Sequence, residues 1–192
     1  MLPGMDLLAG PLDALARHGL LMLHDAALPS VSMLVAGEVV RGSWWGHRDG
    51  HAIFDVASAL ESHPDALVTK LVCGKVTYVH RRLVPALLAV AEARDRWQLD
   101  GLTPEAKALV TRVDEDGGVL ASGDAAKLVE RRLLALGRQV HTPNGRHATE
   151  LLAWSRVARS LDVTPLTSVG DARRELETAA RGLGPTATLP WL

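Results

Sequence analysis

The chain has 192 residues, enough for one large domain or two small ones. Hydrophobic residues make up 47% of it, which supports a packed core, and the formal net charge of −1 gives no general attraction to nucleic acid or anionic membranes. The single cysteine, Cys73, excludes an internal disulfide and a multi-cysteine zinc site, and no apolar run reaches the roughly 18 residues of a membrane span. With no signal-peptide pattern at the N-terminus, we expect a soluble, cytoplasmic protein that does not bind membranes.

The first third of the chain predicts three helices. Apolar residues recur at every third or fourth position over residues 11–28, which is typical of an amphipathic helix, with a break near Gly19. Ser30 is a candidate N-cap for a short helix over residues 31–36. A third helix is expected over residues 50–62. Its predicted buried side consists of Ile53, Phe54, Val56, Ala57 and Leu60.

The clearest strand signal is the stretch "ALVTKLVCGKVTYVHRRL", which starts at residue 66. Two runs rich in β-branched residues, Leu67–Val72 and Lys75–His80, flank the pair Cys73-Gly74. Such runs around a short turn predict a β-hairpin. A further helix is expected over residues 83–94, with Pro85 in its first turn.

The order of three helices and a hairpin over residues 11–82 resembles that of a winged helix-turn-helix domain. The Gly-Ser-Trp-Trp-Gly-His stretch at residues 42–47 also resembles an uncharacterised group of bacterial proteins, and this resemblance implies no established activity. The expected fold class is mainly α with small β-hairpins. A winged helix-turn-helix-like module over residues 1–96 is expected, with a helical module over residues 97–192 packed on it.

The second half of the chain predicts mostly helices, each bounded by capping residues, Gly or Pro. They cover residues 104–116, the stretch from a cap at Ser122 or Asp124 to Leu136, residues 151–161 and residues 169–183. The Asn144-Gly145 pair could join Gln139–Thr142 and Arg146–Leu151 into a second wing. The helical spacing that follows it favours a loop leading into a helix, with a second winged-helix-like module as the alternative.

His47 and His51 follow the tryptophan pair and could share one face of a helix. Zinc needs a third nitrogen, sulfur or carboxylate ligand, and no spacing in the sequence singles one out. The candidates are Asp49, Asp55, Cys73 and His80. We therefore expect no metal and no other cofactor.

One short pattern points to catalysis. In "WQLDGL", Gln98 and Asp100 resemble the Gln-x-Asp pair with which some bacterial winged-helix DNA glycosylases position water. The sequence contains no P-loop, no G-x-G-x-x-G and no G-x-S-x-G nucleophile motif. A glycosylase-like enzyme is therefore the third functional hypothesis, and no catalytic residue is assigned.

Charge is distributed unevenly along the chain. Residues 67–83 carry four Lys or Arg and no Asp or Glu, a net charge of +4, and residues 127–159 carry seven against two, a net charge of +5. Residues 97–126 carry two against six, a net charge of −4. Clustered Lys and Arg suit DNA phosphates, which the wing of a winged helix contacts. Solvated faces or internal ion pairs between the two halves are the alternative.

We therefore predict a non-enzymatic, winged-helix protein that binds double-stranded DNA, with transcriptional regulation as one role. Phosphate contacts are expected from Arg41, Arg48, Lys70, Lys75, Arg81 and Arg82. Base contacts are expected near the start of the third helix, at His47 and His51. In such a wing Lys75 and Arg81 are exposed. The residues expected to pack inward are Val76 and Val79 or Tyr78.

The stretch "GSWWGHRDGH" at residues 42–51 lies where a helix-turn-helix makes its turn. Gly42 and Gly46 permit a tight path, and two tryptophans supply a large apolar area. A stiff corner is the first expectation, with at least one indole packed against the hairpin or the first helix, and a contact surface is the second. The alternative function is a protein–protein interaction module that uses winged-helix elements to form a homodimer, with Trp191 in the C-terminal tail contributing.

Overall fold

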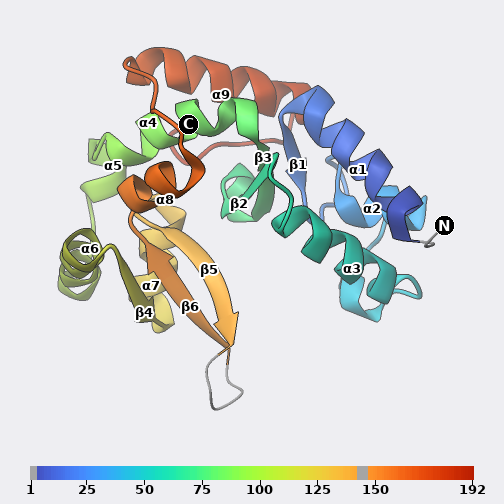
Figure 1. Ribbon diagram of the computed structural model, residues 1–192, viewed down its shortest axis with the longest axis horizontal. Coiled ribbons are helices and arrows are strands. Elements are labelled where there is room, and N and C mark those ends of the chain that lie inside the picture. Colours follow the sequence, from blue (N-terminus) through green and yellow to red (C-terminus); the bar gives the residue numbers. More distant parts are fainter. Residues whose placement is uncertain (1–3, 142–146) are drawn as a thin grey trace. The chain divides into compact units, whose positions relative to one another are not determined.

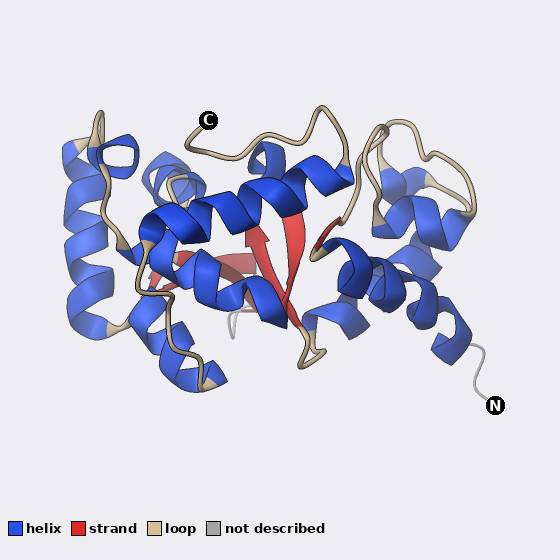
Figure 2. Cartoon of the chain, turned by 90° about the horizontal axis from the view of Figure 1, so that it is seen from above, coloured by secondary structure: helices blue, strands red, loops and turns tan. Residues whose placement is uncertain are grey.

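The structure, a computed structural model, describes the backbone of residues 4–141 and 147–192. The chain forms two compact units, whose elements are labelled in Figure 1. The first unit consists of residues 1–84, 174–190 and 192, and the second of residues 85–173 and 191. The expected boundary between residues 96 and 97 lies inside the second unit. Helices make up most of the regular structure, and the strands are short (Figure 2).

The first unit alternates helices and strands. In chain order it contains α1 (Gly4–His18), β1 (Leu20–Met22), α2 (Val31–Ala36), α3 (Gly50–Glu61), β2 (Ala66–Lys70) and β3 (Val76–His80). Short 3-10 turns lie before α3, between β2 and β3, and after β3. They are η1 (Trp44–Gly46), η2 (Val72–Gly74) and η3 (Arg81–Leu83). The helix α9 (Val169–Leu183) has the predicted bounds, and its residues from Arg174 onward belong to this unit.

The strands of the first unit form one antiparallel sheet in the order β1-β3-β2. The predicted hairpin is confirmed, and its strand ends differ from the expected ones by one or two residues. The expectation that residues 20–28 continue the first helix is wrong. Gly19 adopts a left-handed conformation with φ of +80° and ends α1, and Leu20–Met22 then pair with β3 instead.

The core of the first unit lies between its sheet and its helices. Leu15 of α1, Leu21 of β1 and Leu60 of α3 are fully buried in one cluster. The Tyr78 hydroxyl of β3 donates a hydrogen bond to the carbonyl of Ala57 at 3.2 Å, which ties α3 to the sheet. These contacts fix which side of α3 faces the core.

The second unit has its own helices and strands. They are α4 (Val84–Glu92), α5 (Arg96–Leu99), α6 (Pro104–Asp116), β4 (Gly118–Ala121), α7 (Gly123–Arg131), β5 (Leu136–His141), β6 (His147–Leu152) and α8 (Trp154–Leu161). The prediction of α6 is confirmed. The Thr103 hydroxyl accepts a hydrogen bond from the Ala106 amide, and Gly117 ends the helix in the left-handed conformation.

Two predictions for the second unit are wrong. The helix expected to reach Leu136 ends at Arg131, and Leu133 then adopts a left-handed conformation with φ of +51°. The loop expected before residue 151 contains two strands, because β5 and β6 pair antiparallel from Leu136↔Leu152 to His141↔His147. The Asn144-Gly145 pair lies outside the described residues. This sheet has the order β4-β6-β5, so in both units the first strand pairs with the last.

The fold is mainly helical with two small antiparallel sheets of three strands each in the described residues. No helix in residues 4–141 and 147–192 has both the length and the apolar character needed to cross a membrane.

Candidate functional site

The stretch that leads into α3 carries an aromatic cluster on the surface of the first unit. The rings of Trp44 and Trp45 stack in η1, with centroids 3.9 Å apart. Trp44 is buried, whereas Trp45 is 63% exposed. The Trp45 ring lies 5.5 Å from the ring of Phe54, which is 46% exposed. We call Trp45 and Phe54 the aromatic patch.

The aromatic patch is held in place from below. Trp44 packs against Val40 and Ile53, rather than against the hairpin or the first helix as expected. A Cβ at Gly50 would lie 3.0 Å from the Trp45 carbonyl oxygen, so a larger residue would crowd the close approach of the turn to α3. The stiff corner thus supports an exposed surface. The placement of Phe54 on the buried side of the helix is wrong, because Ile53 beside it takes the core position.

The loop beside the aromatic patch contains a network of opposite charges. The Arg48 guanidinium contacts the carboxylates of Glu38 at 3.1 Å and Asp49 at 3.3 Å. His47 Nε2 lies 3.6 Å from Glu38, and His47 Nδ1 accepts a hydrogen bond from the Asp49 amide. A phosphate at Arg48 would have to compete with these two carboxylates.

The exposed side of α3 carries negative charge. Asp55 and Glu61 are exposed, and the sequence of the helix contains no Lys or Arg. His51 and Phe54 are exposed on the same helix. In a helix-turn-helix this element enters the major groove, where cations favour binding to the phosphates on both sides. The exposed side of α3 instead presents the Phe54 ring and the carboxylates of Asp55 and Glu61.

Two predicted phosphate contacts, at Lys75 and Arg82, have partners inside the first unit. Lys75 is 55% exposed, yet its ammonium lies 2.7 Å from the carboxylate of Asp25, whose side chain is 10% exposed. The Arg82 guanidinium donates hydrogen bonds to the carbonyls of Ala16 and Arg17 at the end of α1. Both contacts lie within the first unit, whereas the charge pattern left open internal ion pairs between the two halves.

The tip of the hairpin is also held within the first unit. Cys73 adopts a left-handed conformation in η2, and its amide donates to the carbonyl of Thr188 at 2.8 Å. The Cys73 thiol lies 3.4 Å from the carbonyl of Thr186. As predicted, Tyr78 and Val79 pack inward, and Val76 is half-buried. The turn is therefore bound by the C-terminal tail.

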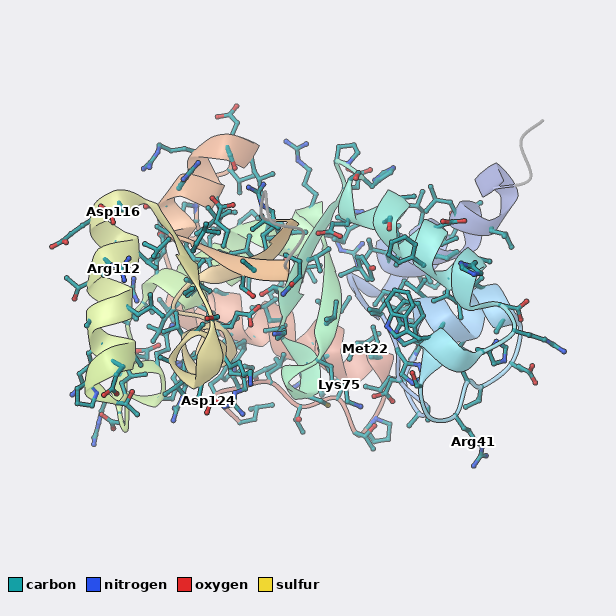
Figure 3. The ribbon with its side chains drawn as sticks, turned by 90° about the horizontal axis from the view of Figure 1, so that it is seen from below. Met22, Arg41, Lys75, Arg112, Asp116 and Asp124 are labelled. Carbon is teal, nitrogen blue, oxygen red and sulfur yellow. The ribbon has the colours of Figure 1, made fainter. Side chains whose placement is uncertain are left out.

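The remaining predicted DNA contacts are spread over the first unit. Arg41 projects from the loop after α2 (Figure 3), and Arg81 follows β3. Neither side chain, nor that of His51, makes a hydrogen bond or ion pair within the part of the chain that the structure describes. Lys70 is half-buried in β2. Of the predicted DNA contacts, His47, Arg48 and His51 lie in the same loop and helix as the aromatic patch.

The residues of the glycosylase-like pattern have other roles in the second unit. Gln98 is fully buried, its amide nitrogen donates to the carbonyl of Ala91 at 3.0 Å, and its amide oxygen accepts from the Asp95 amide at 2.9 Å. Asp100 pairs with Arg96 at 3.4 Å. The amide oxygen of Gln98 thus caps the start of α5 and its amide nitrogen binds a carbonyl of α4, so both ends of the amide have structural partners.

Histidines and carboxylates do not gather into a metal site in the described residues. No group of three or more His, Cys, Asp or Glu side chains there has the arrangement to hold a metal ion. The two ring nitrogens of His47 contact the Glu38 carboxylate and the Asp49 amide. The His51 side chain, at the start of α3, makes no hydrogen bond or ion pair within the described residues.

The Asp25–Lys75 pair predicts how stability depends on pH. Burial raises the pKa of Asp25, but the Lys75 hydrogen bond and the amides of Ala27 and Leu28 outweigh burial, so this pKa lies below its usual range. A depressed pKa contributes stability that is present above the unfolded-state pKa and lost as pH falls through the folded-state pKa. We expect the free energy of unfolding to fall below about pH 4. Urea denaturation between pH 6 and pH 3 measures it, with Asp25→Asn as the control, and equal pH slopes in the two proteins would contradict the assignment.

No protein-family model, curated protein or solved structure matches this chain. What the first unit presents is an exposed indole and phenyl ring, braced from below and flanked by carboxylates. Such a surface can bury apolar groups and attract cations.

Proposed function

We propose that the first unit is a winged-helix-like protein-interaction module whose aromatic patch binds a protein segment that combines apolar anchors with Lys or Arg. The observation that carries the proposal is the exposure of Trp45, at 63%, on a braced turn beside the exposed ring of Phe54. Tryptophan is among the residues most enriched at the energetic centres of protein interfaces.

Exposed apolar side chains are frequent in the segment of the chain that carries this patch. In the described residues, four of the nine exposed large apolar side chains lie between residues 34 and 54, namely Leu34, Val39, Trp45 and Phe54. Each aromatic ring that a partner covers gives a favourable free energy of about 25 cal/mol per Å² of apolar area removed from water.

The charges near the aromatic patch favour a basic partner. The exposed carboxylates of α3 have no Lys or Arg on the same helix, and Arg48 is paired with Glu38 and Asp49. A second copy of the chain would present the same carboxylates, and opposed like charges weaken association. A segment with Lys or Arg beside its apolar anchor complements both features.

DNA binding is the second candidate function. The order α1-β1-α2-α3-β2-β3 and the sheet order β1-β3-β2 support the winged-helix interpretation, and Arg41 and Arg81 are exposed. Against it stand the internal partners of Arg48, Lys75 and Arg82 and the charge of α3. Protein binding is therefore the function that the geometry favours.

Binding of designed peptides tests this proposal. Three amphipathic helical peptides share one apolar face, and their polar faces consist of Lys, Gln or Glu. We expect fluorescence anisotropy to show binding of the Lys peptide at about 10 μM, with weaker binding of the Gln peptide and none of the Glu peptide. Trp45→Ala should lower the affinity for the Lys peptide by roughly tenfold or more.

The control variant is Leu120→Ala, which removes an exposed leucine of the second unit and should leave the affinity unchanged. Equal affinities for the three peptides, or a Trp45→Ala affinity equal to that of the unaltered protein, would refute the proposal. Tight binding of a random 20-base-pair duplex that Arg41→Glu and Arg81→Glu abolish would favour the DNA function instead.

A further inference from the structure

His24 connects three segments of the first unit, one of which leads to the aromatic patch. It follows Leu23, whose amide donates to the Val76 carbonyl at 3.0 Å, so its backbone is anchored next to the sheet. Its ring Nδ1 lies 2.8 Å from the Ser32 hydroxyl of α2, and its ring Nε2 lies 2.8 Å from the Gly42 carbonyl oxygen. The half-buried ring therefore links the sheet, α2 and the loop before η1.

The Gly42 carbonyl determines which ring nitrogen of His24 carries the proton. A carbonyl oxygen only accepts, so Nε2 donates to it, and in the neutral ring Nδ1 then accepts from the Ser32 hydroxyl. Ser32 is fully buried, and its hydroxyl lies 3.2 Å from that of Ser30, which accepts from the Met33 amide at the start of α2. The ring is thus held on one side by the N-terminal cap of α2 and directs an N–H toward Gly42 on the other.

The loop over residues 38–42 depends on side chains for its position. Within the described residues, its main chain makes no hydrogen bond to another main-chain group. Gly42 adopts a left-handed conformation with φ of +76°, two residues before Trp44. Val40 is buried beside Trp44. Together with the bond from His24 to the Gly42 carbonyl, this contact sets the direction in which the chain enters η1.

We propose that His24 is a positioning residue for the aromatic patch. Its bond to the Gly42 carbonyl sets the path of the turn that presents Trp45 to a protein partner. Loss of this bond leaves the loop before η1 free to move, and a partner must then order the loop when it binds, which costs affinity. This role rests on the proposed protein-binding function, and His24 itself lies outside the patch.

Two substitutions of His24 separate the bond to Gly42 from the rest of the ring. The amide nitrogen of glutamine lies the same number of bonds from Cα as Nε2, so His24→Gln keeps a donor for the Gly42 carbonyl. The shorter amide of asparagine corresponds to Nδ1 instead, so His24→Asn loses that donor. We expect His24→Asn to lower the affinity for the Lys peptide by about fivefold and His24→Gln to keep it within about twofold.

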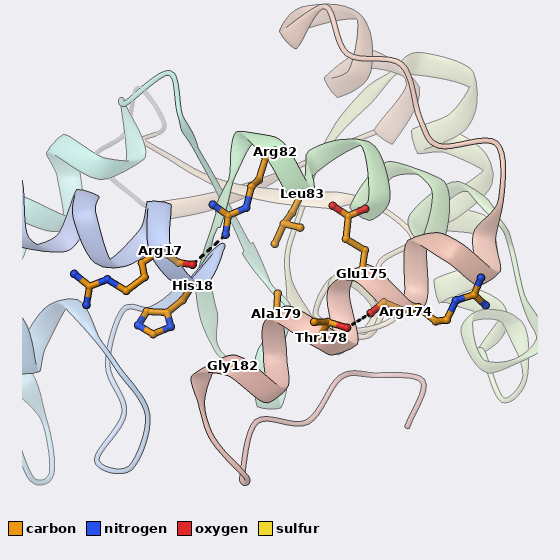
Figure 4. A pocket seen from close by; sticks show the side chains of 9 residues that line it. All are labelled: Arg17, His18, Arg82, Leu83, Arg174, Glu175, Thr178, Ala179 and Gly182. Atoms are coloured by element: carbon orange, nitrogen blue, oxygen red, sulfur yellow. Dashed lines mark hydrogen bonds between the residues drawn. The ribbon is translucent and has the colours of Figure 1, made fainter.

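Arg82→Gln is the matched control. The Arg82 guanidinium also holds a neighbouring segment through main-chain carbonyls, those of Ala16 and Arg17 at the end of α1, and Figure 4 shows the bond to Arg17 as a dashed line. These residues lie on elements other than those that carry the aromatic patch. Arg82→Gln should therefore leave the affinity for the Lys peptide unchanged, and circular dichroism verifies the fold of all three variants.

A measurement without peptide distinguishes this role from the proposed function. In ¹⁵N-labelled protein, the heteronuclear NOE of the Trp45 indole N–H reports how rigidly the turn is held. We expect this NOE to fall in His24→Asn and to keep its original value in His24→Gln and Arg82→Gln. Equal NOE values in the two His24 variants would overturn the role of His24, as would equal affinities when the unaltered protein binds the Lys peptide. If the unaltered protein does not bind it, the proposed function fails and the NOE alone decides the role of His24.

Discussion

Lys75→Glu should lower the free energy of unfolding by about 2–3 kcal/mol. The change replaces the ammonium that lies 2.7 Å from the nearly buried carboxylate of Asp25 with a second carboxylate. Two like charges then face each other where Asp25 has little access to water. Urea denaturation at pH 7 measures the difference.

Arg81→Glu is the matched control for this change, because Arg81 is an exposed residue of the same hairpin region and its side chain has no partner in the described residues. It should change the free energy of unfolding by no more than about 0.5 kcal/mol. Equal effects of the two substitutions would show that Lys75 acts as a solvated wing residue. The pair with Asp25 would then contribute little to stability.

Gly19→Ala should destabilise the first unit by about 2–4 kcal/mol. Gly19 has φ of +80°, which L-residues rarely adopt, and its added Cβ would lie 2.6 Å from Leu83 Cδ1. The same atom would lie 3.0 Å from the Arg82 guanidinium. The substitution therefore combines backbone strain with a steric clash at the junction of α1 and β1, and chemical denaturation measures its effect.

Gly37→Ala separates the two causes. Gly37 has a similar φ of +71°, but a Cβ there would meet no atom within 4 Å. We expect a loss of only about 1 kcal/mol, from backbone strain alone. A Gly37→Ala effect as large as that of Gly19→Ala would contradict the steric part of the explanation.

Helix ends with local signals could be predicted from the sequence. The helix α6 begins at a side-chain cap, Thr103-Pro104, and ends at a left-handed glycine, Gly117. Both signals depend only on neighbouring residues. The bounds of α9 were likewise predictable, because Ser168 accepts from the Asp171 amide at its start and Gly184 follows its end. Such signals act within one turn of the helix.

Strands that depend on distant partners could not be predicted. β1 has only three residues, and it is a strand because β3, more than 50 residues later, supplies the hydrogen bonds. The leucines of β6 have a spacing that also fits a helix, and pairing with β4 and β5 decides between the two. The spacing of apolar residues alone does not show whether such a segment becomes a helix or pairs as a strand.

The candidate site could be predicted only in part. The tryptophan pair marked the segment that carries the candidate site. A helical pattern, however, places both Ile53 and Phe54 near the core, and only packing shows which one is exposed. The sequence also did not show which carboxylate pairs with Lys75. Asp25 and Lys75 are 50 residues apart, and their contact depends on the path that residues 23–28 take after β1 ends.

The tryptophan indole N–H signals test the central claim most directly. The unlabelled Lys-faced peptide is added to ¹⁵N-labelled protein, and the Trp45 and Trp154 signals are assigned by substitution. We predict that the Trp45 signal shifts with peptide concentration, whereas that of Trp154, which is buried and donates to the Leu133 carbonyl at 2.9 Å, stays in place. An unmoved Trp45 signal at saturating peptide, with shifts confined to residues outside 38–61, would contradict the proposed binding surface.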